Sequence, residues 1–531
     1  MEDEELPTVR VFYPYNPHTK TGIECDTDSW APSSGPAEIF TFAIEEKHPI
    51  VARWSDVSKE IARKLDAVGL RWCAIECLQR RQLEKPSETH DDSSVVITVD
   101  ELPPITDEIT EVARSIHELS GNLFVEFIEG GVLRGSASRS EAGQVDRVPQ
   151  AGKLEAASRT RLGIRDLPDK PHEVDQNPPY DRQPDMGGSI GVSGDDCSTG
   201  SFGGYVELYN EEGVMIPCGI TCHHVLRPCK LDGNSGTAPI QPIGQSMSRE
   251  PIQICHPSQA DHEYTVSKYD KRIEESSTGL NRLRSQETTD KNTESIQFLE
   301  KAIPETEREM EKLTSASRDI GTVYATSGHR IHDKTGCLLD WGLIELKPEC
   351  IGVNTSKLRT QNKKRYVPVI KDRWPWSFET ILDRAIPRFY QIGRSSAREG
   401  IINPVKSRVC LRDGPHKTET EELVMVPSEH RSKPSQYGDS GALVVSEMGE
   451  VVGLLWGLRF DKETAWFGGE VSYLTPIGPI IEDIREITGY RVRIGETVKG
   501  LSVEKRTEFS LPSLSREQLR QLKAKADSSN S

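Results

Sequence analysis

Three short segments of the chain carry the side chains needed for a nucleophile, a base and an orienting carboxylate. Residues 438–442 (GDSGA) place Ser440 in a tight, glycine-flanked turn directly before an apolar run. Residues 220–226 (ITCHHVL) offer a base at the end of an apolar strand, and residues 338–344 (LLDWGLI) offer a carboxylate within another. Because a serine hydroxyl is a poor nucleophile at neutral pH, it needs a base within reach and a third group that fixes the tautomer of that base. The segments supply one of each.

The chain order of these segments and their flanks resemble the trypsin-like (chymotrypsin-fold) serine peptidases, whose marks are Thr-x-x-His, Asp-x-x-Leu-Ile and Gly-Asp-Ser-Gly. The resemblance implies that Ser440 is the nucleophile, His224 the general base and Asp340 the buried orienting carboxylate. It also implies an oxyanion hole formed by the backbone N–H groups of Gly438 and Ser440. The implied fold is an all-β double barrel closed by a C-terminal helix, and residues 480–487 have the required helical spacing.

The same resemblance implies a pocket for the side chain before the cleaved bond. Residues 450–457 and 468–474 match the two strands that wall this pocket in the family. The implied pocket residues are Pro434, Leu455, Trp456, Gly457 and Gly469. Pro434 stands where trypsin itself has the aspartate that selects Arg and Lys, and Leu455 stands where the family usually has serine. We therefore expect apolar or small side chains to be preferred over basic ones.

Other arrangements of a catalytic serine fit the chain less well. An α/β-hydrolase needs a histidine after the serine, and none follows Ser440. In a subtilisin-like order, His416 or His430 would be the base, although both are flanked by charged, loop-like sequence. His223 competes with His224 for the role of base, but neighbouring strand residues face opposite ways, so only one can point at the serine. The family spacing selects His224.

A metal site is a further interpretation of the same region. Cys218, Cys222, His223, His224 and Cys229 lie within twelve residues of one another. Their spacing is not the paired Cys-x-x-Cys of structural zinc sites, and buried cysteines that behave as small hydrophobes are common. We expect no metal and no cofactor, since the proposed chemistry requires neither.

The sequence departs from the family in three places. Ala442 replaces the second glycine after the serine, and Gly342 stands where alanine is common. No Arg-Ile-Val-Gly-Gly activation site precedes the domain, and the nearest equivalent is residues 186–192 (MGGSIGV). In the digestive enzymes a new N-terminus pairs with the aspartate before the serine. Asp439 must therefore find another partner here.

Composition restricts the compartment and the partners. The net charge of −17 argues against binding to nucleic acid or to anionic membranes. The first residues lack a basic start with a following apolar run, and no stretch is long enough to cross a bilayer, so we expect a cytoplasmic or nuclear protein that is not secreted. Eleven cysteines without regular spacing agree with a reducing compartment. Protein or peptide substrates are the expected partners.

At 531 residues the chain is too long for one core, and several domains are expected. The pattern β-α-β-β-α-β before residue 134, with helices from residues 55 and 106, suggests a smaller N-terminal α+β domain of split βαβ topology. The expected divisions are an N-terminal segment (1–35), the α+β domain (36–133), a linker (134–185), the peptidase domain (186–490) and a polar tail (491–531).

Asp340 follows His224 by 116 residues, far more than trypsin-like domains usually show. The excess maps to residues 257–317, which are rich in charged side chains and have sparse apolar positions at spacings of three, four and seven. This pattern predicts two helices packed as a hairpin. A charged, solvated appendage and a surface for a partner protein fit it equally well, and the N-terminal domain is a second candidate for a partner surface.

The sequence thus predicts an intracellular serine endopeptidase that works through an acyl-enzyme, like the multidomain cytosolic members of the family in fungi and plants. An alternative is an inactive pseudopeptidase that serves as a protein-binding module. A third interpretation is a peptidase that cuts only itself, within residues 134–185.

Overall fold

The chain is described by a computed structural model. The described residues are 11–12, 39–82, 93–104, 106–134, 180–195, 198–227, 238–242, 250–286, 290–354, 388–395, 397–413, 416–428, 433–461 and 471–495. Within these ranges the protein is mostly β-sheet with few helices, as the sequence predicts. None of the helices found there is long and apolar enough to cross a membrane. The predicted linker and tail fall almost wholly outside these ranges.

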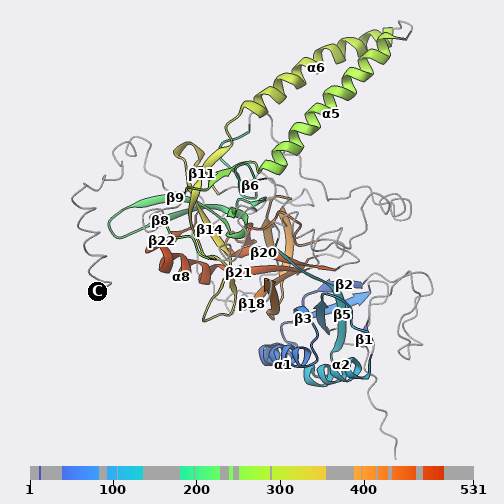
Figure 1. Ribbon diagram of the computed structural model, residues 1–531, viewed down its shortest axis with the longest axis vertical. Coiled ribbons are helices and arrows are strands. Elements are labelled where there is room, and N and C mark those ends of the chain that lie inside the picture. The colour runs from blue at the N-terminus through green and yellow to red at the C-terminus, as the bar shows by residue number, and fades with distance from the viewer. Residues whose placement is uncertain are drawn as a thin grey trace, which may run out of the picture.

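The α-helices lie at the margins of the sheets (Figure 1). They are α1 (Trp54–Ala67), α2 (Asp107–Ser120), α5 (Gln259–Arg284), α6 (Asp290–Ser315) and α8 (Ile477–Thr488). Helices α5 and α6 confirm the hairpin predicted from the charged insertion, and they project away from the sheets. Helix α8 confirms the predicted C-terminal helix. It ends at Gly489, whose φ of +75° is a left-handed conformation that glycine adopts without strain.

One sheet brings the histidine and aspartate segments together. Its strand order is β22-β8-β9-β14-β11-β10-β6-β7. The bounds are β6 (Ser189–Val192), β7 (Gly200–Ser201), β8 (Gly204–Tyr209), β9 (Met215–Cys222), β10 (Gln253–Cys255), β11 (Asp319–Thr326), β14 (Trp341–Leu346) and β22 (Arg491–Arg493). Strands β9 and β14 are antiparallel neighbours, with Cys222 opposite Trp341. The end of β9 therefore lies beside the start of β14, and the residues just outside this pair are His223, His224 and Asp340.

The second sheet carries the serine segment. Its C-terminal strands are β15 (Phe389–Ile392), β16 (Ala397–Ile402), β17 (Ser407–Asp413), β18 (His416–Pro427), β19 (Leu443–Ser446), β20 (Val451–Asp461) and β21 (Val471–Pro476). Six of these strands pair in a closed ring, β15-β16-β18-β21-β20-β19 and back to β15. Ser440 lies in the turn that leads into β19. A separate two-stranded sheet, β12 (Arg330–Ile331) with β13 (Leu338–Leu339), precedes Asp340.

The N-terminal α+β unit extends this second sheet. Its strands are β1 (Val11–Phe12), β2 (Ile39–Phe42), β3 (Trp72–Gln82), β4 (Ser93–Val99) and β5 (Phe124–Arg134). The helices α1 and α2 pack on its own apolar core. However, β3 pairs with β17, and the last residues of β5 pair with β20. The unit is therefore hydrogen-bonded into the strands around the serine instead of standing apart as a separate domain.

The predicted split βαβ topology is wrong. From β2 onward the order of elements is β-α-β-β-α-β as expected, whereas β1, in the predicted N-terminal segment, also pairs with β5. A split unit needs the strands joined by each helix to be parallel and separated by another strand. Strand β2 is instead the antiparallel neighbour of β3, and β4 is the parallel neighbour of β5. The edge of β3 is long enough for β2 to pair near Gln82 while β17 pairs near Ile75. Strand β17, from the C-terminal half of the chain, thus pairs with one part of the β3 edge.

A buried ion pair joins the N-terminal unit to β20. Glu76 of β3 and Arg459 of β20 are almost completely buried, and Arg459 donates to the Glu76 carboxylate. The hydroxyl of Tyr473 also donates to Glu76, at 2.8 Å. Removing one partner of such a pair leaves the other charge buried without compensation, which costs several kcal/mol. Substitution of this pair therefore tests the attachment of the N-terminal unit to β20.

We expect Arg459→Met to lower the free energy of unfolding by about 3–5 kcal/mol in urea denaturation, because it strands the Glu76 carboxylate. The double variant Arg459→Met with Glu76→Leu should recover part of the loss. The control Arg63→Met removes an arginine whose side chain is 69% exposed and should change little. A single variant as stable as the wild-type protein would contradict the burial of this pair.

Candidate active site

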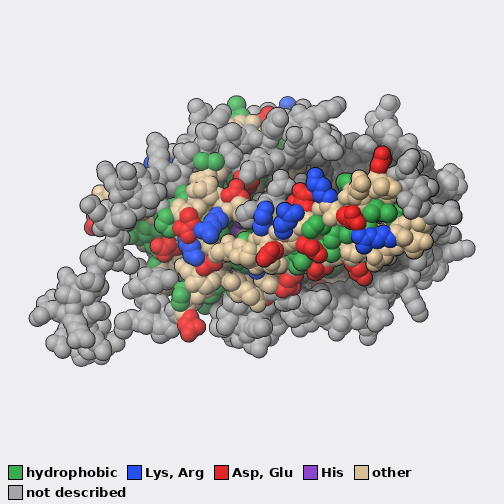
Figure 2. Space-filling view, turned by 90° about the horizontal axis from the view of Figure 1, so that it is seen from above, with side chains coloured by type: hydrophobic (Ala, Val, Ile, Leu, Met, Phe, Trp, Pro, Cys, Tyr) green, Lys and Arg blue, Asp and Glu red, His purple; other side chains and the backbone are tan. Residues whose placement is uncertain are grey.

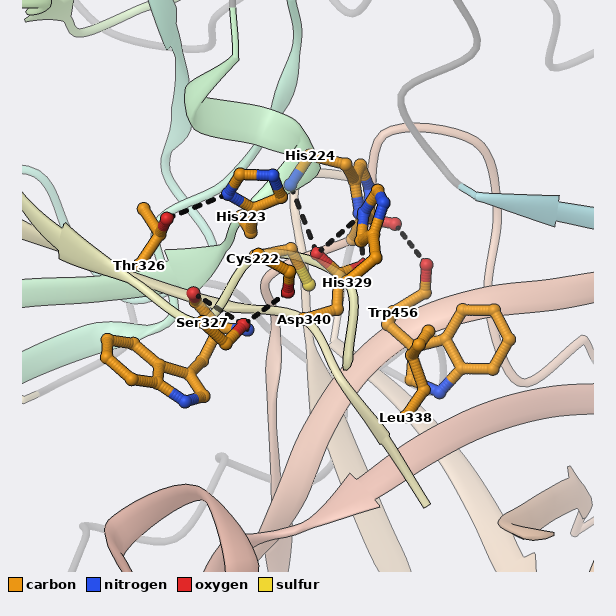
Figure 3. Close-up of polar contacts among 12 residues, drawn as sticks. Cys222, His223, His224, Thr326, Ser327, His329, Leu338, Asp340 and Trp456 are labelled. Carbon is orange, nitrogen blue, oxygen red and sulfur yellow. Dashed lines mark hydrogen bonds and ion pairs between the residues drawn. The ribbon is translucent and has the colours of Figure 1, made fainter. Parts of the chain in front are cut away.

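His224 and Asp340 form a buried hydrogen-bonded pair. Nδ1 of His224 lies 2.5 Å from Oδ2 of Asp340, and the side chains are 7% and 0% exposed (Figure 3). The backbone N–H of His224 donates to Oδ1 of the same carboxylate at 3.1 Å. A carboxylate held in this way fixes the histidine tautomer that leaves Nε2 unprotonated and able to accept a proton.

The neighbouring histidine is directed elsewhere. Nδ1 of His223 lies 2.9 Å from the hydroxyl of Thr326, and its backbone N–H donates to the carbonyl of Asp340 at 3.0 Å (Figure 3). His224, and not His223, therefore contacts the Asp340 carboxylate. Two other histidines were candidates for the base of a subtilisin-like order. His416 is the first residue of β18, and His430 lies outside the described residues.

A third histidine, His329, also approaches Asp340. Its Nε2 lies 3.5 Å from Oδ1, and its ring packs edge-on against that of His223. Burial acts to raise the pKa of Asp340, but His224 and His329 outweigh it and hold the pKa well below its usual range. Asp340 is thus a stable anion that orients an imidazole. Sequence reasoning missed His329 as a residue of the site. The local feature that could have indicated it is its position after Ser327 and Gly328 in a polar turn.

The serine turn and the histidine strand meet on the backbone of β20. The thiol of Cys222 donates to the carbonyl of Leu455 at 3.2 Å, and the N–H of Gly441 donates to the same carbonyl at 2.8 Å. One residue on, the hydroxyl of Ser440 donates to the carbonyl of Trp456 at 3.0 Å (Figure 3). Strand β20 therefore holds the two segments against each other from one side.

The last link of a catalytic triad is not formed. Nε2 of His224 is buried and makes no hydrogen bond within the described part of the chain, while the Ser440 hydroxyl is directed at Trp456. Catalytic hydrogen bonds of ligand-free enzymes are often long or misaligned and tighten only when substrate binds. The Ser440 hydroxyl would have to give up its bond to the Trp456 carbonyl before His224 could take its proton.

Without an activation site, Asp439 needs partners other than a new N-terminus, and it has them. Its carboxylate is fully buried and accepts from the backbone N–H and hydroxyl of Ser395, at 2.8 and 2.7 Å, and from the N–H of Gln436 at 2.8 Å. Arg398, also buried, lies near enough for the Asp439 charge to act on its pKa, although burial is the larger influence and lowers it. The turn is thus held without a new N-terminus.

The predicted pocket residues are placed in part. Pro434, Leu455, Trp456 and Gly457 are buried, whereas Gly469 lies outside the described residues. The indole of Trp456 stacks on Tyr473 and donates to Glu422 at 3.0 Å. Trp456 therefore offers its backbone, and not its ring, to Ser440.

Glu422 is a buried acid that links Trp456 of the predicted pocket to the segment that carries Asp340. It accepts from Trp456 Nε1 and, at 2.7 Å, from the N–H of Leu338, two residues before Asp340. Burial raises the pKa of Glu422 to about 7, above its ordinary value of 4.5. Because the folded chain binds this proton more tightly than the unfolded chain, the stabilisation is complete below about pH 4.5 and is lost as pH rises through about 7.

We expect the free energy of unfolding of the wild-type protein to fall by about 3 kcal/mol relative to Glu422→Gln between pH 4.5 and 7.5. Urea denaturation at a series of pH values measures this difference. A constant offset is also expected, because glutamine can accept only one of the two hydrogen bonds. Stability curves that run parallel across this pH range would contradict the buried acid.

Three side chains of types that can bind a metal come together at this site. Cys222, His224 and Asp340 bring their ligand atoms within 4.8 Å of one another. However, Nδ1 of His224 is engaged by the carboxylate at 2.5 Å, and burial raises the pKa of the Cys222 thiol well above its usual value. A thiolate is the form that binds metal, so the neutral Cys222 thiol is not prepared as a ligand. Of the other predicted donors, Cys218 and His223 are not part of this group, and Cys229 lies outside the described residues.

No known family model matches this chain, and no curated protein matches it. The assignment of a function therefore depends on the site.

Proposed function

We propose that this protein is a serine endopeptidase built on a chymotrypsin-like double barrel. The observation that carries the proposal is the buried 2.5 Å contact between His224 and Asp340, beside a serine turn whose aspartate is fully satisfied. The closed ring of β15, β16, β18, β21, β20 and β19 supports one barrel. The other sheet supports the second barrel, because β7 at one end of it is followed in the chain by β8, the second strand from the opposite end.

In the proposed mechanism Ser440 leaves the carbonyl of Trp456 and turns toward His224. Nε2 of His224 takes the hydroxyl proton as Oγ attacks the peptide carbonyl, while Asp340 stabilises the imidazolium. The N–H groups of Gly438 and Ser440 receive the oxyanion, and the same proton then passes to the leaving amine. Water attacks the acyl-enzyme by the reverse use of His224 and releases the second product.

An intracellular site of action is part of this proposal. The eight cysteines in the described ranges are buried and form no disulfide, whereas secreted peptidases of this fold rely on disulfides. Peptides or proteins would be the substrates.

Reaction with a fluorophosphonate tests the proposal, with the modified residue located by mass spectrometry. We expect one adduct, on Ser440. Folded protein that takes up no label would instead favour the pseudopeptidase, the second candidate, which the hydrogen bond of Ser440 to Trp456 supports. Cleavage between residues 134 and 185 in the wild-type protein, but not in a Ser440→Ala variant, would indicate a self-processing enzyme.

A further inference from the structure

The base of the helical hairpin directs a buried carboxylate toward the serine turn. Helix α5 begins after Ser258, whose hydroxyl caps it by accepting from the N–H of Asp261 at 3.3 Å. The side chain of Asp261 is 0% exposed and accepts from Arg394 through both Nε, at 2.5 Å, and Nη2. The hydroxyl of Ser189, within the segment that stands in place of an activation site, donates to the same carboxylate at 2.5 Å.

Arg394 contacts one peptide group next to Gly438 directly and the other through Ser201. Its Nη1 donates to the carbonyl of Tyr437 at 3.4 Å. Its backbone N–H donates to the hydroxyl of Ser201 at 2.8 Å, and this hydroxyl donates to the carbonyl of Gly438 at 3.0 Å. The guanidinium lies so close that a Cβ on Gly438 would come within 2.4 Å of Nη1. Glycine is required there both for space and for its φ of +82°.

This contact fixes the direction of a proposed oxyanion donor. A trans peptide is planar, so its C=O and N–H point in opposite directions. Because Arg394 holds the carbonyl of Tyr437 toward itself, the N–H of Gly438 in the same peptide points away from the guanidinium. If Arg394 moved, this peptide could rotate about the permissive glycine and turn its N–H out of the hole.

We propose that Asp261 and Arg394 are positioning residues that set the oxyanion loop, residues 436–440, and so couple the hairpin to the reaction. The inference rests on the proposed peptidase function. Asp439 is held by Ser395 on one side of the loop, and the Asp261–Arg394 pair holds the peptide before Gly438 on the other. The coupling takes the place of the cleaved N-terminus of the digestive enzymes.

The hairpin is firmly attached where it would need to act. Arg318, just after α6, donates to the carbonyl of Pro257 at 2.9 Å and to the side chain of Gln259 at 2.5 Å, so both ends of the hairpin join at one guanidinium. Farther out, its surface mixes acidic and basic side chains with apolar ones (Figure 2), with pairs such as Arg284 and Glu300 across the helices. A displacement of the base of α5 would therefore move Asp261.

Two measurements on Asp261→Asn and Arg394→Lys test the inference. One is the second-order rate of labelling of Ser440 by a fluorophosphonate, whose phosphoryl oxygen requires the hole. The other is backbone hydrogen exchange across residues 434–442. Arg394→Lys keeps the buried charge beside Asp261 but loses the Nη1 contact with Tyr437, so it remains informative where Asp261→Asn fails to fold. Glu263→Gln removes a carboxylate from the same turn of α5, where its partner is Gln259, and is the control.

We expect labelling about 10- to 100-fold slower in both variants, with faster exchange in residues 434–442 and unchanged exchange in β16 and β18. Labelling and exchange at wild-type rates in both variants would overturn the inference and leave the peptidase function standing. Wild-type protein that takes up no label would overturn the peptidase function. Hydrogen exchange alone would then test whether Asp261 positions the loop. Faster exchange in Asp261→Asn would support this role, and unchanged exchange would overturn it.

Discussion

Replacing Ser440 by alanine is expected to lower the rate of peptide hydrolysis by on the order of 10⁴-fold or more. The hydroxyl is the group that forms the acyl-enzyme, and no other described hydroxyl lies in the turn between Gly438 and β19. Hydrolysis of a peptide library by the wild-type protein and the variant measures the effect and also reports the preferred residue before the cut. The variant should fold normally, since the change removes only a small hydroxyl group, which donates to the carbonyl of Trp456.

The matched control is Ser446→Ala, the same chemical change at a buried serine in β19. It should keep its activity apart from any loss of stability. Equal hydrolysis by Ser440→Ala and the wild-type protein would show that another nucleophile, or a contaminating enzyme, does the work.

Asp340→Asn is expected to slow hydrolysis by about 10⁴-fold with little change in KM. The carboxylate accepts from Nδ1 of His224 at 2.5 Å and so keeps Nε2 free of a proton. An amide at this position can donate to Nδ1 and favour the opposite tautomer, which cannot act as a base. Initial rates at saturating and limiting substrate separate kcat from KM.

Asp333→Asn serves as the control for this change, because Asp333 is exposed in the turn that precedes β13. A fall of less than about tenfold in Asp340→Asn would contradict the role of Asp340 as the orienting carboxylate. His329, which also approaches Asp340, would then be the next histidine to examine.

Local features of the chain were predictable because their causes lie close together in the sequence. Thr106 caps α2 by accepting from the N–H of Ile109 at 3.2 Å, as the Thr-Asp-Glu start of that helix indicates. Gly489 ends α8, and the charged insertion forms α5 and α6. These outcomes follow from side-chain spacing and capping, which operate over a few residues.

The candidate site was predictable only as far as its motifs reach. The pairing of His224 with Asp340 follows from two strands that end side by side, and the family spacing distinguishes it from a pair with His223. The link of Asp439 to Ser395, the approach of His329 to Asp340 and the link from Asp261 to Arg394 join residues that are 44, 11 and 133 positions apart. Ser395, His329, Asp261 and Arg394 stand in none of the three family motifs, so these motifs could not indicate them.

The arrangement of the N-terminal unit shows the same limit. Its strands and helices are where hydrophobic periodicity indicates, but periodicity does not say which edge is covered. The pairing of β3 with β17 and of β5 with β20 uses free edges that only the complete fold defines. The buried contact of Glu76 with Arg459 belongs to that same junction.

The most direct test of the account is a crystal structure of the fluorophosphonate adduct. We predict a covalent bond from phosphorus to Ser440 Oγ, with the phosphoryl oxygen about 2.7–3.1 Å from the backbone nitrogens of Gly438 and Ser440. Nε2 of His224 should face Oγ of Ser440, with Asp340 still on Nδ1. Phosphorus bound to another residue, or a Gly438 N–H directed away from the phosphoryl oxygen, would contradict it.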